Sequence, residues 1–309
     1  HEIAGIKLHA AIDVQIHHNY IHDCSLGTWL DWQAQGTRVS SNVYDRNNRD
    51  LMVEVTHGPH LVDHNIFTSA YTFDNAAQGG AYVHNLCCGF TNSYPVLDRA
   101  TPYHLPHSTE VLGTVPVYGS DDRWYQNIFV GGKEENRTYG TAQYNGAPVS
   151  LNEYIERFRA LGNGDVEQFM KVRQPAYIHG NVYLNGADHF DREEDCCESH
   201  MDPEVRITEE GEEVYLEITL PQDFWGIPEM QTEIITTQKL GMVRIVEQRF
   251  ESPEGKALRL DVDIRGRARE ERPLPGPVEG LHAGKNRVSV FHRILPQDRK
   301  NSIVRNRLP

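Results

Sequence analysis

The stretches TWLDWQAQGTRVSSN, residues 28–42, and LMVEVTHGPHLVDHN, residues 51–65, are two copies of one repeat. Each copy opens on a short, mostly apolar segment that contains a carboxylate, and each closes on an asparagine. Asp31 and Glu54 both lie eleven residues before the asparagine that closes their repeat. The two carboxylates therefore occupy the same position in consecutive repeats.

The same asparagine-closed pattern recurs along the first two thirds of the chain. The first four asparagines are spaced 23, 23 and 20 residues apart, and the next two follow after 42 and 54 residues. They are Asn19, Asn42, Asn65, Asn85, Asn127 and Asn181. A period of 20–25 residues with short β-branched strands predicts a parallel β-helix, whereas the L-x-x-L-x-L spine of leucine-rich repeats is missing. Each asparagine is expected to hold a turn in the left-handed conformation and to stack on its neighbours through side-chain hydrogen bonds.

The gap of 54 residues exceeds two repeats, so we expect a helical insertion at about 134–176. Ser150 and Glu153 form a capping-box pattern, and Gly162 is placed to end that helix. The predicted β-helix domain covers residues 1–198.

Residues 199–309 have a different sequence pattern, which predicts an antiparallel, β-sandwich-like module. Hairpins are expected around Glu210-Gly211 and around Pro253-Glu254-Gly255. The segments TEIITTQKL, residues 232–240, and NRVSVFH, residues 286–292, add predicted strands.

Composition excludes several classes of protein. The 309-residue chain carries a net charge of -14, which argues against binding to nucleic acid or to an anionic membrane. It has no apolar run near the roughly 20 residues that a membrane span needs. Five cysteines without C-x-x-C spacing predict free thiols in a reducing compartment, and hence a cytoplasmic location. The opening HEIAGIKLH, which lacks a methionine, predicts that the chain is part of a longer protein.

Counting eleven residues back from each asparagine gives Leu8, Asp31, Glu54 and Asp74. Like charges on adjacent strands destabilise a sheet, so a column of carboxylates is expected either to serve a function or to be neutralised by cations. Strands lie about 4.7–4.9 Å apart, close to the carboxyl separation of about 5–5.5 Å in retaining glycosidases. Two alternatives remain open: a solvated acidic stripe, and a calcium site like that of pectate lyases. Glu54 with Asp74 is a rival catalytic pair.

Further polar and aromatic residues lie close to this column in the sequence. Trp29 and Trp32 flank Asp31 and suit the apolar face of a sugar, while His57 follows Glu54 and Gln78 follows Asp74. A substrate-binding wall is predicted from the loop LDRATPYHLPHST, residues 97–109, which contributes Asp98, Arg99, Tyr103, His104 and His107. The pair Asp121-Asp122 precedes a predicted strand, which favours a structural role.

The motifs TWLDW and LMVEV, with NAAQGGAYVHN and LDRATPYHLPHST, resemble those of glycoside hydrolase family 120, the β-helix β-xylosidases. The resemblance is strong over residues 1–132 and weak beyond. It implies a right-handed parallel β-helix and a retaining exo-enzyme that releases xylose from xylo-oligosaccharides. By resemblance, Asp31 is the nucleophile and Glu54 the general acid/base. Glu2, at the start of the sequence, is a further candidate substrate-binding residue.

Two other function classes stay open at this point. A calcium-dependent polysaccharide lyase would need a basic residue near the carboxylates, for which Arg49 and Arg99 are candidates. A non-catalytic carbohydrate-binding β-helix would tolerate loss of Asp31. The glycosidase interpretation requires no cofactor and no metal ligands, and a homo-oligomer is expected.

Overall fold

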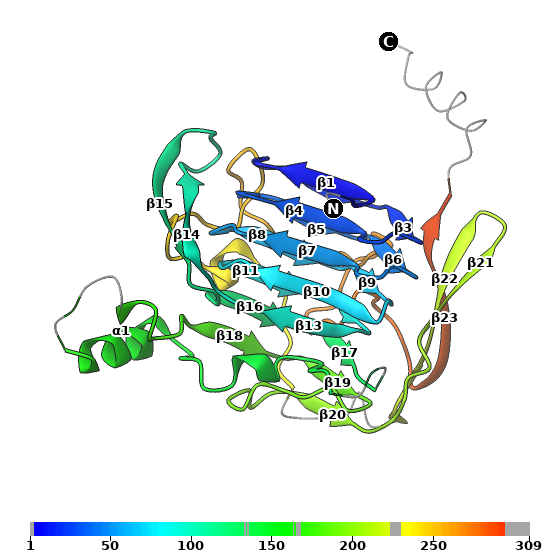
Figure 1. Ribbon diagram of the computed structural model, residues 1–309. Helices are drawn as coiled ribbons and strands as arrows, with labels where there is room; N and C mark the ends of the chain where they lie inside the picture. The colour runs from blue at the N-terminus through cyan, green and yellow to red at the C-terminus, as the bar shows by residue number, and fades with distance from the viewer. Residues whose placement is uncertain are drawn as a thin grey trace, which may run out of the picture.

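The computed structural model describes residues 3–132, 134, 136–162, 164, 168–222 and 230–293 (Figure 1). In the repeat region, each short strand pairs in parallel with the corresponding strand of the next repeat, so three parallel sheets result. The sheet that carries Asp31 and Glu54 contains β1 (Ile6–His9), β4 (Thr28–Asp31), β7 (Leu51–Glu54), β10 (Tyr71–Ala76) and β13 (Phe90–Ser93). The second sheet contains β2 (Gln15–His17), β5 (Arg38–Ser40), β8 (His60–Asp63), β11 (Gly80–Val83), β16 (Asp122–Tyr125) and β18 (Ala176–His179). The third contains β3 (Tyr20–His22), β6 (Val43–Asp45), β9 (Ile66–Phe67), β12 (Leu86–Cys87), β17 (Ile128–Val130), β19 (Val182–Leu184) and β20 (Cys197–Ser199).

Two antiparallel sheets complete the described strands. The hairpin of β14 (Val96–His104) and β15 (Val111–Val117) stands at one end of the first sheet (Figure 1). The C-terminal sheet contains β21 (Arg206–Glu210), β22 (Glu213–Leu220) and β23 (Gly284–His292). The helices are α1 (Leu151–Ala160), α2 (Thr237–Leu240) and a 3-10 turn, η1 (Ala142–Tyr144).

The predicted fold class, a right-handed parallel β-helix followed by a β-sandwich-like module, is wrong in that form. The described residues form three separate parallel sheets and two antiparallel ones, and no sheet among them closes on itself. The strands of one repeat do not pair with each other, because turns separate them and their partners lie in the neighbouring repeats. The expected sandwich is replaced by a single three-stranded sheet.

The asparagines form a continuous hydrogen-bonded ladder, as the repeat predicts. The Oδ1 atom of Asn65 accepts hydrogen bonds from the backbone N–H and from Nδ2 of Asn42, both at 3.0 Å. Asn65 donates in turn to Oδ1 of Asn85, and the ladder ends on the buried carboxylate of Glu193 beside Asn181. The left-handed turn residue is not the asparagine but the residue before it. These positions are His18, Ser41, His64, His84, Gln126 and Gly180.

Aromatic rings fill the space between the three sheets. Tyr82 stacks on Trp124 with ring centroids 3.9 Å apart, and Phe129 stacks on Tyr183 at 5.2 Å. All four side chains are almost completely buried. Because consecutive repeats place these rings one above another, burial of the aromatic column helps to fix the register between the repeats.

The predicted helical insertion is present as α1. The Ser150 side chain accepts a hydrogen bond from the Glu153 backbone, and the carboxylate of Glu153 accepts one from Val149. Gly162 follows the helix with a positive φ of 82°. The capping prediction for this helix is therefore confirmed.

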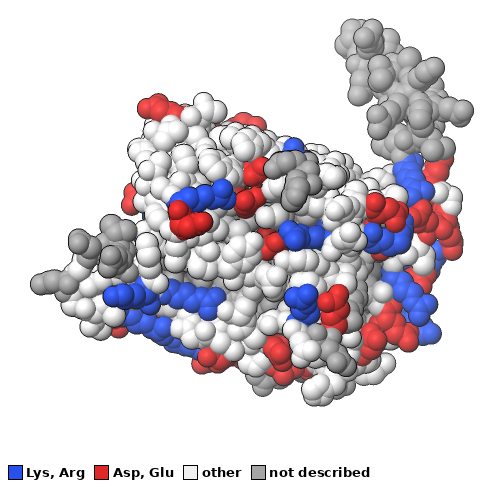
Figure 2. Space-filling model, viewed as in Figure 1, with Lys and Arg blue, Asp and Glu red and all other residues white. Residues whose placement is uncertain are grey.

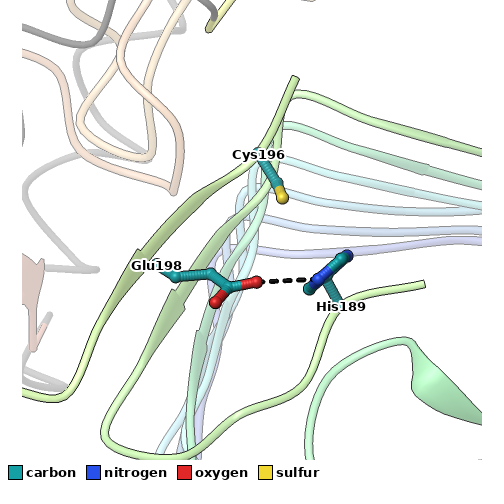
Figure 3. Close-up of side chains that lie close together, drawn as sticks. All are labelled: His189, Cys196 and Glu198. Carbon is teal, nitrogen blue, oxygen red and sulfur yellow. Dashed lines mark ion pairs between the residues drawn. The ribbon is translucent and has the colours of Figure 1, made fainter. Parts of the chain in front are cut away.

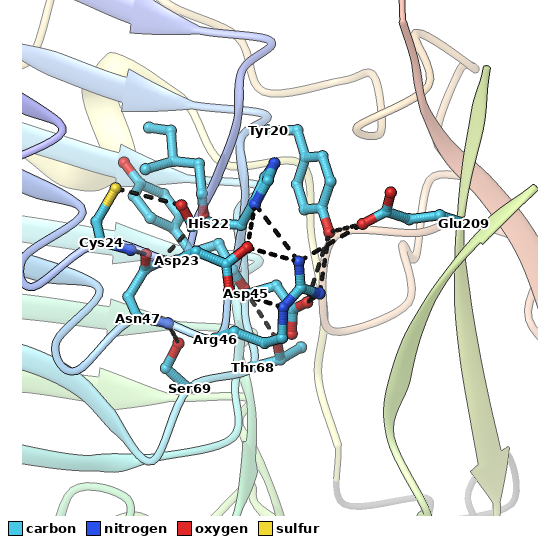
Figure 4. Close-up of polar contacts among 12 residues, drawn as sticks. Tyr20, His22, Asp23, Cys24, Asp45, Arg46, Asn47, Thr68, Ser69 and Glu209 are labelled. Carbon is cyan, nitrogen blue, oxygen red and sulfur yellow. Dashed lines mark hydrogen bonds and ion pairs between the residues drawn. The ribbon is translucent and has the colours of Figure 1, made fainter. Parts of the chain in front are cut away.

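The C-terminal sheet packs on the third parallel sheet through a shared apolar core that includes Val43, Ile66, Leu216 and Ile218. A polar cluster closes one edge of this contact (Figure 4). In it, the Tyr20 hydroxyl donates to Glu209 at 2.8 Å, which joins the first repeat to β21.

The hairpin around Glu210-Gly211 and the strand at 286–292 are present, as β21–β22 and β23. The segment 232–240 was predicted as a strand, but Thr236 caps the short helix α2, since its hydroxyl accepts from Lys239. The turn at Pro253-Glu254-Gly255 forms only the isolated bridge between Glu251 and Ala257. Among the described residues, no helix is long and apolar enough to cross a bilayer.

Candidate active site

Asp31 ends β4 and Glu54 ends β7, and the two residues are direct register partners in the first sheet. Side chains alternate along both strands, so the buried Leu30 and Val53 face the core while the carboxylates face outward. Parallel pairing sets the two backbones about 4.7–4.9 Å apart at this position. The side chain of Asp31 is 9% exposed and that of Glu54 is 22% exposed.

Asp31 is paired with two basic side chains from β1. Lys7 Nζ and His9 Nδ1 each lie 3.0 Å from Oδ2 of Asp31. Lys7 also lies over the Trp29 ring, 3.7 Å from its centroid. Neither Lys7 nor His9 was predicted from the sequence, because counting back from Asn19 selects Leu8, whereas His9 is the register partner of Asp31 and Lys7 lies two residues before it.

Glu54 accepts hydrogen bonds on both of its oxygens. Trp29 Nε1 donates to Oε2 at 3.1 Å, and Arg99 Nη2 donates to Oε1 at 3.0 Å. Arg99 comes from β14, and its guanidinium lies 5.1 Å from the centroid of the Trp32 ring. The hairpin thus brings a cation over the sheet, and Figure 2 shows basic and acidic side chains gathered together on this face.

Asp74 does not belong to the carboxylate column. In the paired strands it lies opposite Met52, while Ala76 lies opposite Glu54. The fourth repeat is shorter than the two before it, so counting back from its asparagine gives the wrong register. Asp74 pairs instead with Arg49 at 2.8 Å. The rival pair of Glu54 with Asp74 is therefore wrong as a pair of adjacent residues.

His57 and Gln78 lie inside the protein, below the hairpin. His57 is 2% exposed, its Nε2–H donates to the Thr101 carbonyl at 2.9 Å, and its Nδ1 accepts from Gln78 at 2.6 Å. Burial lowers the pKa of His57 to about 4, so the ring is neutral at pH 7. Tyr103 packs edge-on against this ring with centroids 5.6 Å apart. These contacts hold the base of the hairpin and are made to protein groups.

His104 is also buried, and two glutamines that the sequence analysis did not single out hold it. Its Nε2 lies 2.8 Å from Gln33 Oε1, while Gln35 bonds both the backbone N–H and the carbonyl of His104. Both glutamines follow Asp31 within four residues. The link therefore ties the segment after the carboxylate to the end of β14. Glu2 lies outside the described residues.

The aspartates Asp121 and Asp122 are buried away from the carboxylate pair. Asp121 pairs with Arg123 at 3.0 Å. Asp122 accepts from Tyr144, Asn75 and Gly80. Burial raises the pKa of Asp122 to about 7. These contacts of Asp121 and Asp122 join strands to loops.

A cavity of about 810 Å³ lies elsewhere, between the first repeat and β23. Its lining includes Tyr20, Arg265 and Phe291, and none of the predicted catalytic or substrate-binding residues. Its size therefore gives no reason to move the candidate active site away from Asp31 and Glu54, where basic and aromatic groups converge on a carboxylate pair.

No protein-family model and no curated protein matches this chain. A solved structure described as "The complex structure of XylC with xylose" is similar, with 52% sequence identity and a TM-score of 0.90. The match covers 94% of this chain and 45% of that chain, so this chain spans less than half the length of XylC. This chain thus shares its fold, and half of its aligned residues, with part of a protein that was solved with xylose bound.

Proposed function

We propose that this protein is a retaining exo-β-xylosidase that releases xylose from the non-reducing end of xylo-oligosaccharides. The register pairing of Asp31 with Glu54 carries the proposal, because a retaining glycosidase needs two carboxyl groups about 5–5.5 Å apart. The likeness to a xylose-bound structure supports the choice of sugar. Exo-action on xylo-oligosaccharides rests on the family resemblance of the sequence motifs.

In this proposal Asp31 is the nucleophile. Lys7 and His9 converge on one of its oxygens and place an ammonium group and an imidazole ring beside the attacking carboxylate. Asp31 attacks the anomeric carbon, the glycosidic bond breaks, and a covalent xylosyl-enzyme forms. The cation of Lys7 lies beside the attacking group and orients it, while the indole N–H of Trp29 donates to Glu54.

Glu54 is the proposed general acid/base. It gives its proton to the leaving oxygen, and then, as a carboxylate, takes a proton from the water that releases xylose from Asp31. Its greater exposure suits a group that must meet both the leaving group and water. Arg99, which is 38% exposed and comes from the hairpin, is free to shift from Glu54 toward a substrate hydroxyl when Glu54 carries its proton.

The calcium-dependent lyase is less well supported by this arrangement. Each carboxylate on this face already has its own cation: Lys7 for Asp31, Arg99 for Glu54, and Arg49 for Asp74. A calcium site would need these carboxylates to turn away from their partners. If no hydrolysis is detected, a carbohydrate-binding module without catalytic activity becomes the better interpretation. The expected homo-oligomer is a separate prediction, which analytical ultracentrifugation of the protein tests.

The test is hydrolysis of p-nitrophenyl β-xyloside by the full natural protein and its variants. Asp31→Gly and Glu54→Ala should each lower kcat by at least about 1000-fold. Azide should restore Glu54→Ala and give β-xylosyl azide, because azide attacks the xylosyl-enzyme without a general base. Asp261→Asn, which removes an exposed carboxylate that pairs with Arg259, is the control for loss of charge. An Asp31→Gly variant that keeps most of its activity would refute the proposal.

A further inference from the structure

Beyond the carboxylate pair, three side chains with metal-ligand chemistry converge at the last repeat. His189 follows β19, Cys196 directly precedes β20, and Glu198 lies within β20. One ligand atom from each lies within 4.8 Å of the other two. Figure 3 shows the three side chains pointing toward one another from two neighbouring segments. Cys196 and Glu198 are two residues apart, so extended backbone places them on the same side.

The hydrogen bonds of His189 give a second, independent indication. Its Nδ1 lies 2.7 Å from the Phe190 carbonyl, which only accepts, so Nδ1 carries the proton. In the neutral ring Nε2 is then a lone pair, and it faces Oε1 of Glu198 at 2.8 Å. Nε2 therefore faces the same space that Oε1 of Glu198 and the sulfur of Cys196 approach. A backbone carbonyl that fixes the far ring nitrogen is also the usual support of a metal-binding histidine.

We propose that His189, Cys196 and Glu198 bind one zinc ion. Imidazole nitrogen, thiolate sulfur and carboxylate oxygen are the ligand types that tetrahedral Zn²⁺ takes, and a thiolate selects against magnesium and calcium. Water completes the tetrahedron. In the sequence these three ligands have the spacing H-x6-C-x-E, which differs from the C-x-x-C spacing of common zinc sites.

The geometry requires only small side-chain movements. Bonds of about 2.0–2.3 Å at tetrahedral angles set the ligand atoms about 3.3–3.8 Å apart. The pair of His189 and Glu198 therefore opens slightly, and the sulfur of Cys196 draws in. The side chains of His189 and Glu198 are 37% and 55% exposed, so both have room to turn and the ion has access.

The position explains what such an ion would do. Among the described residues, β20 is the edge strand of the third sheet. The ion would link the segment after β19 to β20 and hold the end of the repeat stack closed. It lies on a different sheet from Asp31 and Glu54, so the proposal does not depend on the glycosidase function.

The experiment uses tag-free protein with Zn²⁺ and with Co²⁺ as a spectroscopic probe. We expect one equivalent of Zn²⁺ to bind, to raise Tm and to protect one thiol from a thiol reagent. Co²⁺ should give a thiolate-to-metal charge-transfer band in the near ultraviolet. Cys196→Ser should abolish the band, and His189→Gln should weaken Zn²⁺ binding by more than the roughly 10- to 100-fold that loss of an outer partner costs.

Cys24→Ser is the matched control, because Cys24 is also partly buried and follows a histidine and an aspartate in the sequence. It should leave the band and the zinc stoichiometry unchanged. Absence of a thiolate band in the wild type, or zinc binding that survives Cys196→Ser, would overturn the proposal. If Cys196→Ser fails to fold, zinc protection of a single thiol in the wild type decides, and a full count of reactive thiols with zinc present refutes it.

Discussion

Replacement of one asparagine of the ladder should destabilise the protein far more in the middle of the stack than at its end. The Asn65 side chain makes five hydrogen-bond contacts: Oδ1 accepts two from Asn42, and the two N–H groups of Nδ2 are shared among Val39, Asp63 and Asn85. Asn65→Ala removes all five. It also leaves the buried backbone N–H of Asn42 without the partner that this side chain supplied.

The magnitude follows from these contacts. The two accepted bonds and the two N–H groups of Nδ2, at about 0.5–1.5 kcal/mol each, and about 1–3 kcal/mol for the orphaned buried donor, give an expected loss of about 3–9 kcal/mol for Asn65→Ala. Asn19, at the first repeat, donates only two side-chain bonds, to His17 and Asn42, in a more exposed setting. Asn19→Ala should therefore cost only about 1 kcal/mol.

The assay is urea unfolding of both variants and the wild type, with the free energies extrapolated to water. Because the ladder sets the register between repeats, Asn65→Ala should also lower the proposed xylosidase activity, whereas Asn19→Ala should not. If the two variants differ by less than about 1 kcal/mol in unfolding free energy, hydrogen bonding along the ladder does not stabilise the stack, and the reasoning fails.

Three further predictions concern the site. Lys7→Met leaves the carboxylate of Asp31 without its lysine. It should lower kcat/KM by about 10- to 100-fold, which corresponds to about 1.4–2.7 kcal/mol. An unchanged kcat/KM would show that Lys7 does not orient the nucleophile. Arg99→Met removes the cation beside Glu54 and should lower kcat/KM about tenfold, mainly by raising KM. Arg99→Lys should recover part of this loss. A decrease in kcat alone would contradict a role of Arg99 in binding substrate. The pKa of His57 is lowered from 6.5 to about 4, so the unfolded state binds a proton more readily, and unfolding free energy should fall by up to about 3 kcal/mol as pH drops from 6.5 to 4. Stability above pH 6.5 should not depend on this group, and a His57→Gln variant with the same acid dependence as the wild type would refute the assignment.

Much of the candidate site was predictable because two consecutive repeats have equal length. Asp31 and Glu54 are 23 residues apart and are register partners, whereas Leu8, also 23 residues before Asp31, pairs with Leu30. The register partner of Asp31 in the first repeat is His9. The same counting failed for Asp74, because the next repeat is three residues shorter and the strand pairing absorbs the difference before the asparagine. Periodicity therefore predicts strand register only to within one or two residues, because the number of residues between strand and asparagine varies from repeat to repeat.

The fold was predictable to the level of its elements. The repeat indicated parallel strands stacked one above another, and the capping residues indicated the helix in the insertion. The closed β-helix and the sandwich were not borne out, because sheet closure and the packing of two sheets depend on long-range contacts. Residues 232–264 show this: their β-branched pattern favoured strands, yet the backbone forms α2 and isolated bridges.

The sequence by itself determined the repeat, the asparagine ladder and the carboxylate pair, because these depend on spacing along one chain and on parallel pairing. Only the tertiary structure decided which charges meet those carboxylates. Lys7 comes from the preceding repeat, and Arg99 from a hairpin 45 residues beyond Glu54. The convergence of His189 with Cys196 and Glu198 was decided in the same way. Contacts of this kind depend on how the strands stack and where the loops fold back, and no local pattern in the sequence encodes that.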